Sequence, residues 1–236
     1  MHNNDILKLY HQENIFTDLK RIKAMNGIIN ERYVSFSRHY NLFILFQKLL
    51  NFLKNEGIEY FAISGLLIGL MRHNNSFIPW DDDIDICVFE KDRQKLFDSI
   101  KKYDNLYFTI SPIGVIKVTD SKYIDNNQIF NDIFMIEPKN TYKYDFSELK
   151  HLQLWPNQHI YFSEIYPLQD VDFHLYLPDG KIFQTIKVKV PNKSKQFMNR
   201  VYPNWENEFL IARAHNGFYQ LFSDKKIVIQ GNDLKS

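Results

Sequence analysis

The sequence predicts an α/β protein, because segments with helical periodicity alternate with short apolar segments that favour strands. The most regular helical stripe has apolar residues at every third or fourth position: Leu42, Leu45, Phe46, Leu49, Leu50 and Leu53. The most regular strands are predicted over residues 58–63 and 84–89. With 236 residues, the chain fits one large domain, or one domain with an appendage.

The order of elements follows from turn and cap residues. The first fifty residues read as helical, and Gly57 ends the helix of the stripe. A strand over residues 58–63 then leads through Ser64-Gly65 into a short helix over residues 66–71. Further strands are predicted over residues 84–89, 106–110, 115–118, 128–136, 160–177 and 181–190, and helices over 91–103, 193–201 and 206–222. We expect a helical region over residues 1–56 that packs on a core over 57–222, and a peripheral tail over 223–236.

Composition excludes several classes of protein. Lys and Arg number 29 against 28 Asp and Glu, and this balance argues against broad nucleic-acid binding. Cys87 is the only cysteine, which excludes an intrachain disulfide and a cysteine-rich zinc site and suits a reducing compartment. The polar N-terminus lacks the apolar run of a signal peptide, and the most apolar stretch, residues 42–53, is too short and too polar for a transmembrane helix. We therefore expect a cytoplasmic protein.

The chemistry is concentrated in the acidic run that opens the strand over residues 84–89. Side chains two apart in a strand point to the same side, so Asp83 and Asp85 place two carboxylates on one face, roughly 6–7 Å apart along the chain. Ile84, Ile86 and Val88 fill the other face. Carboxylates this close repel each other, and Mg²⁺ or Mn²⁺ would remove the conflict. The alternative is a solvated acidic turn, but Asp is depleted in strands and costly to bury without a partner.

The Ser64-Gly65 turn precedes this acidic pair by about twenty residues. A glycine between a strand and a helix lets backbone N–H groups approach a phosphate, and the helix N-terminus favours an anion. Many such turns only connect two elements. Together with Asp83 and Asp85, however, the turn resembles the core of the nucleotidyltransferase superfamily, in which a Gly-Ser or Gly-Gly turn holds phosphates and paired acids hold a metal ion.

A longer stretch resembles one family. The run Gly65-Leu66-Leu67-Ile68-Gly69-Leu70-Met71-Arg72-His73, followed by Phe77-Ile78-Pro79-Trp80-Asp81-Asp82-Asp83-Ile84-Asp85-Ile86, resembles the signature of the LicD family, which includes fukutin and fukutin-related proteins. Asn131-Asp132-Ile133-Phe134 is similar to the D-I-F-P segment of the family. Tyr166-Pro167-Leu168, Val190-Pro191-Asn192 and Arg200-Val201-Tyr202 resemble its C-terminal stretch. The resemblance spans residues 58–205.

This resemblance implies a fold and an activity. The fold is nucleotidyltransferase-like, with a mixed β-sheet flanked by helices. The activity is a metal-dependent transfer of a phosphorylated alcohol, such as phosphocholine or ribitol phosphate, from a CDP-linked donor to a glycan acceptor, with release of CMP. The cofactor implied is Mg²⁺ or Mn²⁺. Without a built-in anchor, the protein would act in the cytoplasm or at the periphery of a membrane, on a membrane-linked glycan intermediate.

The resemblance also assigns roles to residues. Asp83 and Asp85 would hold the metal, and Asp132 would complete the coordination or act as the base toward the acceptor hydroxyl. Ser64 and Gly65 would contact the donor phosphates. The cations assigned to the diphosphate are Arg72, which alternatively caps its helix, and the weaker candidate Lys117.

Neighbouring residues receive supporting roles. We expect His73 to order its loop, and Asp81 and Asp82 to shape the turn or surround the metal ligands. Trp80 is expected to be a packing anchor and Cys87 a buried small hydrophobe.

The sequence departs from the family pattern at three places that bear on the donor and the acceptor. Leu66 stands where the family has Thr, Met135-Ile136-Glu137 replaces Pro-Leu-Asp, and Pro203-Asn204 replaces a Tyr-Gly pair. Two alternative functions therefore stay open. One is a nucleotidyltransferase that uses a nucleoside triphosphate and releases pyrophosphate. The other is a catalytically inactive module of the same fold that binds a glycan or a partner.

Overall fold

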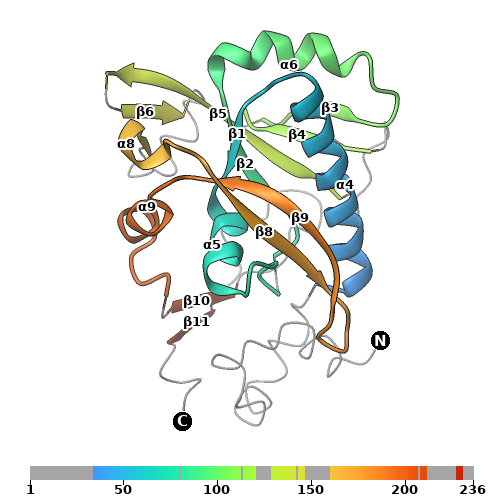
Figure 1. The fold of residues 1–236 in the computed structure, drawn as a ribbon, viewed down its shortest axis with the longest axis vertical. Helices are drawn as coiled ribbons and strands as arrows, with labels where there is room; N and C mark the ends of the chain where they lie inside the picture. Colours follow the sequence, from blue (N-terminus) through green and yellow to red (C-terminus); the bar gives the residue numbers. More distant parts are fainter. Residues whose placement is uncertain are drawn as a thin grey trace.

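The computed structural model describes residues 34–79, 81–112, 114–120, 129–141, 143–146, 160–206, 208–211 and 227–230. Their centre is a seven-stranded sheet (Figure 1). Its main path runs through β1 (Tyr60–Ala62), β2 (Asp85–Phe89), β5 (Asn131–Asn140), β4 (Ile116–Thr119) and β3 (Tyr107–Ile110), and β6 (Lys143–Phe146) and β7 (Ile160–Tyr161) extend it beyond β5. The strands β2 and β5 are parallel, and the other pairs are antiparallel. The expected mixed sheet is confirmed.

The two parallel strands form because both are apolar and nearly continuous, as expected for strands covered on both faces. In β2 the residues Ile86, Cys87 and Val88 are completely buried, as are Ile133 and Met135 in β5. The expected burial of Cys87 is thus confirmed. Asp85 and Asp132 are direct partners in this parallel ladder, so both carboxylates leave the sheet on the same face.

The helix α4 (Phe36–Asn55) covers the opposite face. Its N-cap is Ser35, whose hydroxyl accepts a hydrogen bond from the backbone N–H of Arg38. Its Phe52 contacts Phe108 of β3 edge to face. Within this sheet Phe108 pairs with Val118, which points away from the carboxylate face. The helix ends as expected before Gly57, which takes a positive φ of 58°.

A separate hairpin lies across the molecule beside α4 (Figure 1). It consists of β8 (Gln169–Tyr176) and β9 (Ile182–Val190), which pair antiparallel. Phe173 of β8 is completely buried, and its ring packs against the rings of Phe43 in α4 and of Phe77 in the loop after α5. The hairpin therefore closes the apolar core around the N-terminal half of α4.

The remaining helices connect the strands at the edges of the sheet. They are α5 (Ser64–Arg72), the short 3-10 helix η1 (Glu90–Asp92), α6 (Arg93–Ile100), α8 (Phe162–Ile165) and α9 (Ser194–Val201). Gly69 allows α5 to approach the following loop closely, since a Cβ atom there would lie 2.3 Å from the carbonyl oxygen of Ser76. This contact fixes α5 against the loop that leads toward the acidic run.

Some predicted elements are wrong. The strand expected over residues 160–177 is interrupted by α8 and by the cis peptide bond between Tyr166 and Pro167. In the helix expected over 206–222, the described part, β10 (Glu208–Ile211), is a strand that pairs with β11 (Ile227–Gln230) in the presumed tail. Pairing with a distant strand overrides a local helical pattern. Asp83 lies in a bend before β2 rather than in the strand.

Other predictions concern the arrangement as a whole. Residues 1–33, Trp80 and residues 212–226 lie outside the described residues. The division into a helical region over 1–56, a core over 57–222 and a tail over 223–236 stays a prediction. Among the described residues, no helix combines the length and the apolar character needed to cross a lipid bilayer.

Candidate metal and phosphate site

Three carboxylates meet where β2 and β5 begin. Asp85 opens β2, and Asp132, the second residue of β5, is its parallel partner. The backbone N–H of Asp132 donates to the carbonyl oxygen of Ile84 at 2.7 Å, which continues the ladder to this end. Asp83 joins them from the preceding bend. One carboxylate oxygen from each of the three acids lies within 4.8 Å of the other two.

This arrangement is electrostatically costly for the protein alone. Burial, followed by the charges of Asp83 and Asp132, raises the pKa of Asp85 well above its ordinary range. The backbone N–H of Gly65 donates to Asp85 Oδ2 at 3.3 Å and acts in the opposite direction. The site therefore favours a group that brings positive charge between the carboxylates.

The donor set fits a hard divalent cation. Oxygen ligands suit Mg²⁺ or Mn²⁺, and opposite ligands of an octahedral Mg²⁺ are about 4.2 Å apart, twice the ~2.1 Å metal–oxygen distance. Because the three oxygens all lie within 4.8 Å of one another, they are near enough to be ligands of one ion. Asp81, Asp82 and Asp83 form a second group whose oxygens also lie within 4.8 Å of one another, but Asp82 is held by a cation of the protein, as described below.

Lys117 supplies a positive charge beside the acids. It lies on β4 directly opposite Asp132, and its Nζ donates to both carboxylate oxygens of that residue, at 2.9 and 3.0 Å. Nζ also lies 3.5 Å from the ring centroid of Phe130. The side chain of Lys117 is 25% exposed, so the ammonium can reach a ligand from this position. The sequence prediction placed Lys117 beside the site, and the structure does so.

The start of α5 adjoins the acids from the other side. Besides the contact of Gly65 with Asp85, Ser64 takes a positive φ of 46°, and its hydroxyl lies 3.0 Å from the hydroxyl of Tyr202 after α9. A strained backbone at a non-glycine residue is common at binding sites. The structure thus brings Ser64 and Gly65 to the carboxylates, together with Tyr202, for which the sequence analysis assigned no separate role.

Arg72 lies at the other end of α5. Its Nη1 donates to the backbone carbonyl of Trp205, and its Nε donates to Nε2 of His73 at 3.1 Å. Burial lowers the pKa of Arg72 to about 10. These contacts join α5 to the segment after α9 and do not reach Asp83, Asp85 or Asp132. His73 is buried at the loop, as its expected ordering role requires.

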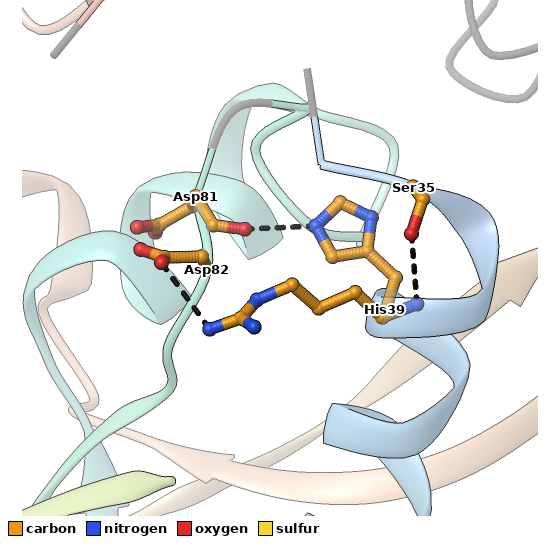
Figure 2. Close-up of polar contacts among 5 residues, drawn as sticks. Ser35, His39, Asp81 and Asp82 are labelled. Carbon is orange, nitrogen blue, oxygen red and sulfur yellow. Dashed lines mark hydrogen bonds and ion pairs between the residues drawn. The ribbon is translucent and has the colours of Figure 1, made fainter. Parts of the chain in front are cut away.

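The acidic run is also held by α4, on residues that the sequence analysis did not select. Figure 2 shows His39 of α4 facing Asp81, whose carbonyl oxygen lies 2.8 Å from His39 Nε2. Nη2 of Arg38 lies 3.4 Å from Oδ2 of Asp82, which is almost completely buried. Burial lowers the pKa of His39 to about 4. In the sequence, the only indication of this contact is that His39 lies three positions before Leu42 and so continues the apolar stripe of α4.

Two related sequences belong to proteins described as uncharacterized. The chain is 25% identical over 183 residues to the uncharacterized protein RP689 of Rickettsia prowazekii (strain Madrid E). This alignment covers 78% of the chain and 62% of RP689. It is 26% identical over 193 residues to the uncharacterized protein RT0683 of Rickettsia typhi (strain ATCC VR-144 / Wilmington). This alignment covers 81% of the chain and 55% of RT0683. The chain thus spans roughly three fifths of the length of these relatives.

Two solved structures are more distant. The lincomycin-bound lincosamide antibiotic adenylyltransferase LnuA aligns with 65% of this chain and 82% of its own, at 12% identity and a TM-score of 0.40. The Cid1 poly(U) polymerase aligns with 50% of this chain and 37% of its own, at 19% identity and a TM-score of 0.33. Neither likeness carries information about a substrate.

The family comparison is more extensive. The family described as LicD/FKTN/FKRP, nucleotidyltransferase domain, matches residues 57–178, more than half of the 236 residues. The matched range contains the start of α5, Asp83, Asp85, Lys117 and Asp132. The chain therefore belongs to the LicD/FKTN/FKRP family and carries its nucleotidyltransferase domain.

Proposed function

We propose that this protein is a metal-dependent phosphotransferase, which moves a phosphorylated alcohol from a CDP-linked donor to a glycan acceptor and releases CMP. The observation that carries the proposal is the meeting of Asp83, Asp85 and Asp132, with one oxygen of each within 4.8 Å of the others. Family membership supports it, since the resemblance of the sequence to LicD proteins implies this class of reaction.

In this proposal the three acids hold Mg²⁺ or Mn²⁺, which would supply positive charge to the donor diphosphate. Asp83 and Asp85 serve only as ligands. Asp132 either completes the coordination or accepts the proton of the acceptor hydroxyl. Its present pairing with Lys117 keeps the carboxylate in place on β5. With a cation held by the three acids, the ammonium of Lys117 would no longer be needed by Asp132 and could supply positive charge to the phosphate that leaves with CMP.

The start of α5 is proposed to bind the donor phosphates. The N–H of Gly65 already points at a negative oxygen, that of Asp85, next to the proposed ion. The hydroxyls of Ser64 and Tyr202 lie at the same end of the helix and can donate to a phosphate oxygen. Arg72 supports this arrangement indirectly, because its contact with Trp205 ties α5 to the segment that carries Tyr202.

The test is CMP release from a panel of CDP-linked alcohols (choline, ribitol and glycerol), with a crude glycan extract as acceptor, in the presence and absence of Mg²⁺ or Mn²⁺. The Asp85→Asn variant runs beside the wild type. Asp98→Asn is the matched control, because Asp98 is an exposed acid of α6 whose side-chain partners among the described residues are Gln94 of the same helix and Lys101 just after it.

Metal-dependent CMP release that is lost in Asp85→Asn and kept in Asp98→Asn supports the proposal and names the donor class. Pyrophosphate release from a nucleoside triphosphate, without CMP release, would replace it by a nucleotidyltransferase. Glycan binding that survives Asp85→Asn, with neither product formed, would indicate a binding module. The cytoplasmic location stays a prediction.

A further inference from the structure

The N-terminal end of α4 and the residue Val34 just before it make three contacts with the acidic run and the loop that leads into it. The backbone N–H of Val34 donates to the carbonyl oxygen of Pro79 at 3.0 Å. Nε2 of His39 lies 2.8 Å from the carbonyl oxygen of Asp81, and a carbonyl can only accept, so Nε2 carries the proton and donates. The third contact is the ion pair of Arg38 with Asp82. Val34, Arg38 and His39 all lie outside the family match over 57–178.

His39 is itself fixed firmly enough to hold the loop. It is completely buried, and its ring stacks on Phe77 with centroids 4.3 Å apart and an angle of 7° between the rings. Phe77 in turn packs on Phe173 of the hairpin β8–β9. The donor that meets Asp81 therefore belongs to the rigid core rather than to a mobile surface side chain.

On its other side the same loop presses against α5. A Cβ atom at Gly65 would lie 2.0 Å from Oδ2 of Asp81, so the carboxylate of Asp81 fills the space that a larger residue would need. The N–H of Gly65 donates to Asp85. The acidic run is thus enclosed between the first turn of α4 and the first turn of α5, and a shift of Asp81 would disturb both Gly65 and Asp85.

We propose that Arg38 and His39 are positioning residues that hold Asp83 and Asp85 in the geometry needed to bind the divalent cation. This inference rests on the proposed metal site. Arg38 acts by neutralising and anchoring Asp82, and His39 acts by holding the backbone of Asp81. Direct partners of metal ligands typically contribute about 10–100-fold to metal affinity. Arg38 and His39 hold the residues just before Asp83, so losing either contact should weaken binding by an amount near the lower end of that range.

The experiment measures the dissociation constant of Mn²⁺ by electron paramagnetic resonance of the free ion. His39→Phe retains an aromatic ring on Phe77 but removes the donor, whereas His39→Gln retains an N–H donor. Arg38→Gln removes the charge, whereas Arg38→Lys retains it. Lys48→Gln is the matched control. Lys48 belongs to the same helix, α4, but its exposed ion pair with Asp120 lies away from the acidic run. Thermal unfolding without metal is recorded for each variant.

We expect His39→Phe and Arg38→Gln to weaken Mn²⁺ binding about tenfold, and His39→Gln and Arg38→Lys to recover most of that loss. Lys48→Gln should bind Mn²⁺ as the wild type does. Weakened binding that the conservative variants do not restore would contradict a role for these particular contacts. So would unchanged Mn²⁺ affinity in His39→Phe and Arg38→Gln, even if both unfold at lower temperature, since that pattern means that α4 only stabilises the fold.

Asp85→Asn separates this inference from the proposed function. If the wild type binds Mn²⁺ and Asp85→Asn does not, the metal site stands, and the α4 variants alone decide the inference. If the wild type binds no Mn²⁺, the metal site and the positioning role are both wrong.

Discussion

The two ends of the acidic run lie in opposite electrostatic surroundings. At the first end, Asp82 is buried beside the guanidinium of Arg38, and the backbone of Asp81 is held by His39. At the second end, Asp85 lies among other acids, and burial together with the charges of Asp83 and Asp132 raises its pKa. At the first, compensated end the protein itself supplies an opposite charge, that of Arg38, whereas at the second, crowded end carboxylates lie close to one another.

In our proposal, this difference separates the residues that support the site from those that bind the metal ion. A buried carboxylate with a fixed cation has its electrostatic cost offset inside the protein. A cluster of carboxylates with raised pKa destabilises the fold until something positive binds, and proteins retain such clusters at functional sites. Lys117 offsets the negative charge of Asp132. It does not relieve the whole cluster, because the charges of Asp83 and Asp132 still raise the pKa of Asp85.

The largest expected effect concerns the crowded end. Asp85→Asn should reduce metal-dependent CMP release by at least ~100-fold, beyond the ~10–100-fold typical of losing an outer partner of a metal ligand. Asp82→Asn should reduce it less, since Asp82 acts through the loop. The comparison fails if the two variants lose activity equally at saturating Mn²⁺.

The second prediction concerns the compensated end and is about stability. Asp82→Ala should lower the free energy of unfolding by about 2 kcal/mol, because it leaves the partly exposed guanidinium of Arg38 without its buried partner. Urea denaturation of the metal-free protein measures it. Adding Arg38→Gln to Asp82→Ala should cost less than the sum of the single changes, as expected for a direct pair. Strict additivity would count against the ion pair.

The third prediction has the opposite sign. Without metal, Asp85→Asn should raise the free energy of unfolding by about 1 kcal/mol, as is common when a strained functional group is removed. Asp82→Asn, at the compensated end, should not. Saturating Mn²⁺ should then stabilise the wild type and leave Asp85→Asn unchanged. A destabilised metal-free Asp85→Asn would show that Asp85 is a structural residue.

The last prediction concerns a buried base outside the acidic run. Burial, and then the charge of Arg72, lowers the pKa of His73 well below its ordinary value of 6.5. The unfolded chain then binds a proton that the folded protein does not, so stability should decrease as the pH falls below 6.5, by at most about 1.4 kcal/mol per pH unit.

The His73→Asn variant lacks this proton. The difference in unfolding free energy between wild type and variant should therefore shrink between pH 7.5 and pH 5.5, as measured by urea denaturation at each pH. A difference that stays constant over this range would mean that His73 is protonated, or accessible to protons, in the folded protein.

The sequence alone allowed us to select the three acids of the candidate site, but not the residues that hold the acidic run in place. Asp83, Asp85 and Asp132 could be selected because acids beside buried apolar strands need a partner, and because the run resembles a family signature. That Asp132 pairs in register with Asp85 and lies opposite Lys117 depends on strand order, which no local pattern contains.

The supports come from residues that are distant in sequence. Arg38 and His39 read as part of an ordinary helix, and only the folded chain brings them to Asp82 and Asp81, more than forty positions later. Arg72 donates to the carbonyl of Trp205, a backbone partner that a sequence does not mark, and its expected role at the diphosphate stays a prediction. The strand β10 was mistaken for a helix because its partner β11 follows at a distance.

The most direct test of the account is the anomalous scattering of Mn²⁺ in crystals of the protein. The account predicts a peak within about 2.3 Å of carboxylate oxygens of Asp83, Asp85 and Asp132, with the ammonium of Lys117 withdrawn from Asp132. A peak held by Asp81 and Asp82 instead, or no peak at saturating Mn²⁺ with Lys117 still on Asp132, would contradict it.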